Sequence, residues 1–328
     1  RTLWFQMAAI SFTIVFAWFI NTEMELRRVM TFFVILSFIS TLVGLFFFAP
    51  WDFTGSIAEW MGRSRGRYWS GSAINLMRTL SMSKEIYSTI LNSDFYAAYL
   101  VMTIWIPLAM FFVEDHPGYK VLGFSTFLLM GICLVFTYSN DSYGSVALGL
   151  LVFGVLSYRH LREWISRRLL ITVLLGLLVL GGTVLLLMVP KLAQGWQFKT
   201  EAFEGRKVLW GGGFWPWLYG ENVARTSLDW VSILFGTGPG GYSIYFPLFR
   251  RFDFFDNQIN NVTTFGHNWY LDVLLEFGLL GLVLFLWFYG RVLYDALRQI
   301  YTTQKRTHQL YQIALVAGLV SIALQNFF

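Results

Sequence analysis

The sequence predicts an all-α polytopic membrane protein, a bundle of about eight transmembrane helices with a long, partly helical outer loop. Three observations predict it. Of the 328 residues, 56% are hydrophobic and only 13% are charged, against roughly 25% charged in soluble domains. Apolar windows of about 17 to 21 residues, the length that crosses ~30 Å of hydrocarbon, recur along the chain. Tryptophan and tyrosine gather at the window ends, as amphipathic rings do at the headgroup level.

The apolar windows set the predicted helix order. They cover residues 2–20, 29–49, 95–113, 121–137, 143–158, 169–189, 270–290 and 309–327. The window at 143–158 is short, and Gln325 and Asn326 lie near the end of the last one. None has the form of a removable signal peptide. Because the chain starts at Arg1 without an initiating methionine and ends at Phe328 inside an apolar run, we expect both termini to be truncated.

Basic residues in the connections predict the orientation. Connections 21–28, 114–120, 159–168 and 291–308 carry 2, 1, 4 and 4 lysines and arginines, whereas the short connection 138–142 carries none. The first set is therefore predicted to be cytoplasmic. Segments 50–94 and 190–268 alternate with these connections and are therefore predicted to lie on the opposite side. Their basic residues do not contradict this, because long loops are largely exempt from the rule. The predicted organisation is an N-terminal bundle over 1–189 with about six helices, an outer loop over 190–268 that caps an amphipathic cavity, and a C-terminal helix pair over 269–328.

Basic residues in the two outer segments suggest a function for the net charge of +5. Segments 50–94 and 190–268 carry 5 and 7 basic residues. A planar guanidinium binds phosphate oxygens through two parallel hydrogen bonds, so these residues predict an anionic partner such as a diphosphate-linked lipid. Alternatively, they extend to lipid headgroups or pair with nearby carboxylates. Nucleic acid is a poor partner, because the charges lie on the non-cytoplasmic side and no nucleic-acid fold pattern surrounds them.

The second outer loop has internal order. Residues 201–210 predict a short amphipathic helix in which Phe203, Lys207 and Trp210 share one face. The later stretch FGTGPGGY at 235–242 is rich in glycines, which permit positive φ angles and close approach to a ligand. This stretch lacks the Gly-Lys-Ser/Thr ending of a P-loop and sits in no βαβ pattern, so the nucleotide-binding fingerprints do not apply.

A titratable imidazole lies where this loop meets the window 270–290. His267 has a side chain whose ordinary pKa lies nearest neutral pH, so it can accept a proton from an attacking hydroxyl without metal or cofactor. Alternatively, it is a helix-start residue bonded to headgroups or backbone. In a straight helix Asn268, Asp272 and Glu276 share a face, and Glu276 lies about 13 Å past His267, where it either orients the site or fixes helix packing. The lone Cys133 excludes an intramolecular disulfide, and no pattern requires a metal.

Four stretches together resemble one family of membrane enzymes. They are LNSDFYAAYL at 91–100, YSNDSYGS at 138–145, GRKVLW at 205–210 with the glycine stretch after it, and GHNWYL at 266–271 with Glu276 and Gly278. In this order they resemble the bacterial O-antigen ligase and O-antigen polymerase superfamily, and the last stretch is the most specific. There are two departures from the family's pattern: Ser93 stands in place of a proline, and Tyr143 stands in place of an arginine.

The resemblance implies transfer of a glycan from a polyprenyl diphosphate carrier to an acceptor sugar hydroxyl, without a metal or other cofactor and with inversion at the anomeric carbon. It places the chain in the bacterial inner membrane with the site facing the periplasm or exterior. His267 matches the general base, and Arg206 matches an arginine that holds the diphosphate. Arg250 or Arg251 would supply the charge that Tyr143 lacks. The predicted substrate-binding residues are Arg250, Arg251, Tyr143, Asn268 and Glu276.

Two other functions stay open from the sequence. A non-catalytic subunit or scaffold that retains the family fold is favoured by Tyr143 and by the 19% aromatic content, which suits lateral contacts with partner membrane proteins. A transporter or flippase requires discontinuous helices and charged residues near mid-membrane, for which Glu276 is the candidate.

Overall fold

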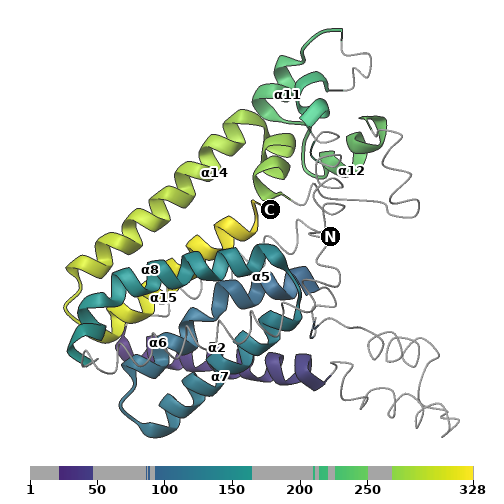
Figure 1. Ribbon diagram of the computed structural model, residues 1–328. Coiled ribbons are helices and arrows are strands. Elements are labelled where there is room, and N and C mark those ends of the chain that lie inside the picture. Colours follow the sequence, from purple (N-terminus) through teal and green to yellow (C-terminus); the bar gives the residue numbers. More distant parts are fainter. Residues whose placement is uncertain are drawn as a thin grey trace, which may run out of the picture. The chain divides into compact units, whose positions relative to one another are not determined.

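The computed structural model describes residues 22–46, 86, 88, 93–164, 210, 214–220, 226–249 and 268–327. Within these ranges the secondary structure is entirely helical, in agreement with the predicted all-α fold (Figure 1). Six of the described helices are long and apolar enough to cross a membrane. The predicted windows 2–20 and 169–189 lie outside the described residues. The chain divides into two compact units: Arg1–Ser157 with Asp295–Gln325, and Tyr158–Tyr294 with Asn326–Phe328.

The first unit is a bundle of membrane helices. It contains α2 (Glu23–Phe46), α5 (Ser93–Thr103), α6 (Trp105–Val113), α7 (Pro117–Phe136), most of α8 (Asn140–Trp164), the end of α14 (Trp269–Thr302) and α15 (Arg306–Gln325). Helix α6 packs against α7 and α15, and α2 packs against α7. The helices α5 and α6 form one membrane span with a break at Ile104. Pro107 explains the break, because its ring displaces the carbonyl of Thr103 four residues earlier and it has no N–H to donate.

Trp105 is the centre of this bundle. Its side chain is fully buried, its indole N–H donates to the Val101 carbonyl oxygen at 2.9 Å, and its ring stacks on Phe153 of α8. A side chain at Gly149 of α8 would overlap the indole ring, and one at Gly318 of α15 would overlap the α5 backbone. Small residues at these two positions therefore let α8 and α15 approach the α5–α6 span closely, as in other membrane bundles.

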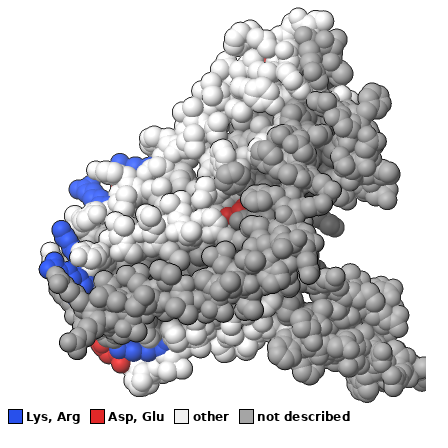
Figure 2. All heavy atoms as spheres, viewed as in Figure 1, with Lys and Arg blue, Asp and Glu red and all other residues white. Residues whose placement is uncertain are grey.

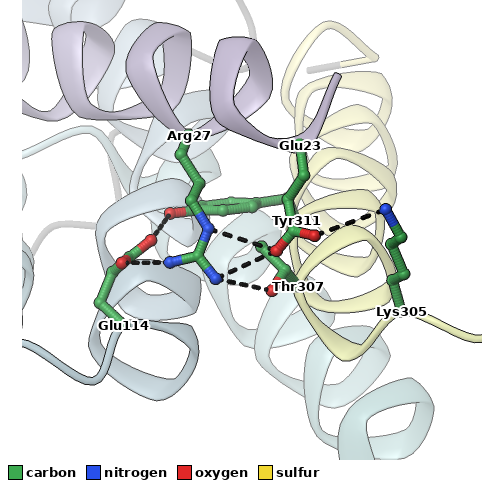
Figure 3. Close-up of polar contacts among 6 residues, drawn as sticks. All are labelled: Glu23, Arg27, Glu114, Lys305, Thr307 and Tyr311. Carbon is green, nitrogen blue, oxygen red and sulfur yellow. Dashed lines mark hydrogen bonds and ion pairs between the residues drawn. The ribbon is translucent and has the colours of Figure 1, made fainter. Parts of the chain in front are cut away.

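An ion-pair network ties three helix ends together at one end of the first unit (Figure 3). Arg27 of α2 donates to Glu23 at 3.1 Å, to Glu114 at 2.6 Å and to Thr307 at 3.1 Å. Tyr311 of α15 donates to the second oxygen of Glu114 at 3.3 Å. The start of α2, the α6–α7 connection and the α14–α15 connection therefore lie at the same end, as the alternating topology requires.

Exposed basic residues also lie at this end of the first unit. On the face drawn in Figure 2, blue side chains gather around the start of α15, and the sides of the described helices show mainly uncharged atoms. Arg298, Lys305 and Arg306, which flank the α14–α15 connection, are all exposed. Charged ends and uncharged sides suit helices that cross a bilayer.

The network predicts an unequal response to mutation. Glu114 is only 7% exposed, so the change Arg27→Ala leaves a buried carboxylate without its cation. Breaking a fully buried pair costs about 3–5 kcal/mol; because a third of Arg27 is exposed, we expect about 2 kcal/mol here. Lys305→Ala is the matched control, since Lys305 lies 3.6 Å from Glu23 and is largely exposed. Thermal unfolding in detergent measures both, and equal melting temperatures would contradict the assignment.

The second unit contains the end of α8, a short helix over 214–219, and α11 (Trp230–Phe235), α12 (Gly241–Tyr245) and η3 (Phe246–Phe249), followed by most of α14. Tyr242, Phe246 and Leu275 are buried together, and Trp210 and Trp217 pack against them. The α12–η3 segment and the beginning of α14 therefore share one hydrophobic core.

Candidate functional site

Helix α14 contains a sharp corner at Gly278, where the backbone has φ 68° and ψ −169°. The rings of Trp269 and Tyr270 lie 6.4 Å and 6.1 Å from that of Phe285, although 16 and 15 residues separate them. A straight helix would place such residues about 23 Å apart. The first arm (269–277) therefore folds back along the second arm (279–302), as Figure 1 shows next to α11. The prediction of one continuous helix over 270–290 is wrong at this point, because the glycine reverses the chain.

The glycine-rich loop after α11 completes the hydrogen bonding of this corner. The N–H groups of Thr237 and Gly238 donate to the carbonyl oxygens of Leu275 and Glu276 at 2.8 Å and 2.9 Å. Those carbonyls end the first arm, where helices otherwise leave acceptors unpaired. The Glu276 carboxylate in turn accepts from the N–H of Gly240 at 2.9 Å. Glu276 therefore fixes the loop in place, and its depth in the bilayer stays a prediction.

Two glycines allow the loop and the corner to touch. Gly236 and Gly278 both have positive φ angles, 78° and 68°. A side chain on Gly236 would overlap the backbone of Glu276, and a side chain on Gly278 would overlap the backbone of Leu234. These glycines were predicted to permit close approach to a ligand; in the structure the loop makes close contacts with α14.

Asn268 fixes the start of α14. Its side-chain oxygen accepts from the N–H of Leu271 at 3.0 Å and caps the first turn. Its amide nitrogen donates to the carbonyl oxygen of Phe327 at 2.8 Å, and the N–H of Trp269 donates to that of Asn326 at 3.1 Å. The residue that directly follows His267 in the sequence therefore has both polar side-chain atoms engaged in holding the helix start.

Tyr143, in the first unit, also serves the fold. Its hydroxyl donates to the carbonyl oxygen of Val135 at 2.8 Å. Val135 is in the last turn of α7, where carbonyls lack helical partners. The hydroxyl proton of Tyr143 is therefore committed to the α7–α8 turn. Its role in substrate binding stays a prediction.

Four predicted site residues lie outside the described residues, namely His267, Arg206, Arg250 and Arg251. Of the other three, Asn268 and Glu276 lie near opposite ends of the first arm of α14. Within the described ranges no group of three or more His, Cys, Asp or Glu side chains could hold a metal ion.

Asp229 is a residue that the sequence analysis missed. Its side chain accepts from the hydroxyl of Ser232 at 2.7 Å and from the N–H of Val231 at 3.0 Å, and so caps α11. The bond from Ser232 is the main cause that lowers the pKa of Asp229 below its usual value. The cap therefore stabilises the folded state above the ordinary aspartate pKa, and this stabilisation is lost as the pH falls through the lowered pKa. The signal was the capping residue before an apolar run.

The described helices are those of a multi-pass helical membrane protein in which a loop is hydrogen-bonded to an interrupted helix. The family model described as O-antigen ligase matches residues 125–286, which is 162 of 328 residues. No curated protein and no solved structure matches the chain. This match supports the O-antigen ligase superfamily, as the motifs predicted. The matched family suggests a glycosyltransferase-type enzyme that acts at the membrane on a lipid-linked glycan and an acceptor.

Proposed function

We propose that this protein transfers a glycan from a polyprenyl diphosphate carrier to an acceptor sugar hydroxyl at the outer face of the bacterial inner membrane, as an O-antigen ligase or polymerase does. The observation that carries the proposal is the family match. It runs from the middle of α7 past the corner of α14 and contains all seven predicted site residues.

The proposed reaction needs two residues in defined roles. The acceptor hydroxyl oxygen attacks the anomeric carbon, and His267 takes the hydroxyl proton as the new C–O bond forms. The bond from that carbon to the diphosphate oxygen breaks, and its electron pair leaves with the diphosphate. Arg206 stabilises the negative charge that builds there. Attack from the face opposite the leaving group inverts the anomeric carbon, and no metal is required for the charge balance.

The remaining predicted residues have two roles, to compensate the charge of the diphosphate and to position the site. Because the hydroxyl proton of Tyr143 is committed to Val135, we assign compensation of the diphosphate charge to Arg250 or Arg251. Asn268 and Glu276 are assigned to position the site, since both are engaged in fixing the first arm of α14.

One observation favours the transporter alternative, namely the interruption of α14 at Gly278. Transporters use such breaks to present unpaired carbonyls to an ion or substrate. Here the carbonyls of Leu275 and Glu276 accept hydrogen bonds from the loop. The break therefore serves to dock the loop, and this supports the transferase over the transporter.

A release assay tests the proposal. The purified full chain in lipid vesicles is given a polyprenyl diphosphate-linked oligosaccharide, with or without a glycolipid acceptor and with or without a metal chelator. We expect acceptor-dependent release of polyprenyl diphosphate that the chelator does not change. Binding without bond cleavage would support the scaffold, movement of intact carrier across the bilayer would support the transporter, and loss of release in chelator would refute the metal-free mechanism.

A further inference from the structure

The uncharged part of the second arm of α14 is too short to cross a bilayer by itself. From Gly278 to the first charged residue, Arg291, it has 12 uncharged residues, 279–290, which span about 18 Å. A hydrocarbon core of ~30 Å needs about 20 residues. Arg291 lies over the ring of Tyr294, one turn further from the corner. Even if this turn is added, the corner remains about 7 Å inside the hydrocarbon, and helix tilt would place it deeper.

The segment fastened to this corner has the composition of a membrane segment. None of the 20 residues from Trp230 to Phe249 is charged, and Asp229 and Arg250 flank them. Large apolar side chains of this segment face outward in the structure. They are Trp230, Val231, Leu234, Phe235, Ile244 and Leu248, with Trp230 and Phe235 exposed by 65% and 62%.

Four backbone N–H groups of this segment meet the requirement for burial in lipid. Irregular backbone is tolerated at membrane depth only where its polar groups are paired. The N–H groups of Thr237 and Gly238 donate to α14, and that of Gly240 donates to the Glu276 carboxylate. The N–H of Gly236 donates to the Ser232 carbonyl within α11. The loop therefore brings these polar groups to the corner already paired.

We propose that residues 230–249 form a re-entrant segment that sits among the acyl chains of the outer leaflet. It completes the hydrocarbon thickness that the second arm of α14 leaves uncovered, and its exposed apolar side chains contact lipid. The leaflet follows from the predicted orientation, in which the α14–α15 connection is cytoplasmic. The outer loop is thereby anchored in the bilayer between Asp229 and Arg250. The Glu276 carboxylate helps to hold it to the membrane helix by accepting the Gly240 N–H.

Spin labels on single cysteines test the proposal in lipid vesicles. In a Cys133→Ser background, Phe235→Cys and Ile244→Cys are labelled and their collisions are measured with oxygen, which concentrates among acyl chains, and with a nickel chelate, which stays in water. Val155→Cys on the exposed side of α8 is the lipid control, and Asp115→Cys in the exposed α6–α7 connection is the water control. We expect Phe235 and Ile244 labels to lose nickel collisions to the level of Val155.

Two results would overturn the proposal. Nickel collisions at the level of Asp115 would place the segment in water, and labels shielded from both probes would show that protein covers it. Leu248→Cys gives a third exposed site should either variant melt below the parent protein. Because glycan release is not the readout, failure here leaves the proposed function intact.

Discussion

The His267→Ala variant is expected to lose glycan transfer by about 10²- to 10⁴-fold, the contribution of a positioned general base. Without the imidazole, the acceptor hydroxyl must lose its proton to water, so the oxygen attacks as a weaker nucleophile. Release of polyprenyl diphosphate per mole of folded protein in lipid vesicles measures the effect.

His116→Ala provides the matched control for this loss. His116 is exposed and caps the first turn of α7 by accepting from the N–H of Gly118 at 3.1 Å. Its removal costs some helix stability but touches no predicted site residue. Wild-type turnover by His267→Ala would remove the imidazole from the mechanism, and equal losses in the two variants would trace the effect to folding.

Gly278→Ala should open the corner of α14. The new methyl group would occupy the position of the Leu234 backbone, and the residue would have to keep a φ of 68°. At this φ and ψ, which essentially only glycine adopts, another residue costs about 1–3 kcal/mol, and overpacking costs typically 1–3 kcal/mol. We expect a local loss of about 3 kcal/mol, close to 100-fold in the equilibrium for opening. Faster hydrogen exchange at the amides of Thr237 and Gly238 measures it.

Gly290→Ala separates this effect from the general response of a helix to alanine. Gly290 lies in the second arm of the same helix, and a side chain there would meet no atom within 4 Å. Alanine favours helix over glycine by up to ~1 kcal/mol, so this variant should be neutral or slightly stabilised. Equal exchange rates in the two variants would show that the corner is not held by close backbone contact.

The membrane helices could be predicted from composition because a span is long and its signal is summed over many residues. The windows 29–49 and 121–137 correspond to Glu23–Phe46 and Pro117–Phe136. The windows begin up to six residues late. A helix starts at its capping residue, and the caps here lie in charged sequence that a hydropathy window leaves out; His116 before Pro117 is an example.

The corner of α14 could not be predicted in this way. Residues 273–290 read as an apolar run interrupted only by Glu276, and a window average does not detect a change of direction. The partner that makes the reversal stable is the glycine stretch some 40 residues earlier, whose N–H groups carry no sequence signal of their destination. Asn268 was expected from the motif to contact substrate, but its role as a cap depends on local geometry. The pairing of His267 with Arg206 stays a prediction.

The ion pair between Arg27 and Glu114 could not be predicted from the sequence either. Arg27 and Glu114 are 87 residues apart in the chain. Counting basic residues predicts the side on which a connection lies but not which acid it will meet. Their meeting depends on the packing of α2, α6 and α15, which follows from small residues and buried polar groups rather than from charge.

The network around Arg27 also constrains how the protein is made. Arg27 bonds Thr307, which is synthesised 280 residues later. At ~5–20 residues per second, α2 waits on the order of 14 to 56 seconds for this partner. Until then the guanidinium can pair only with partners made earlier, such as Glu23 on the same helix and Glu114. The network around Arg27 can therefore close only after the start of α15 has left the ribosome.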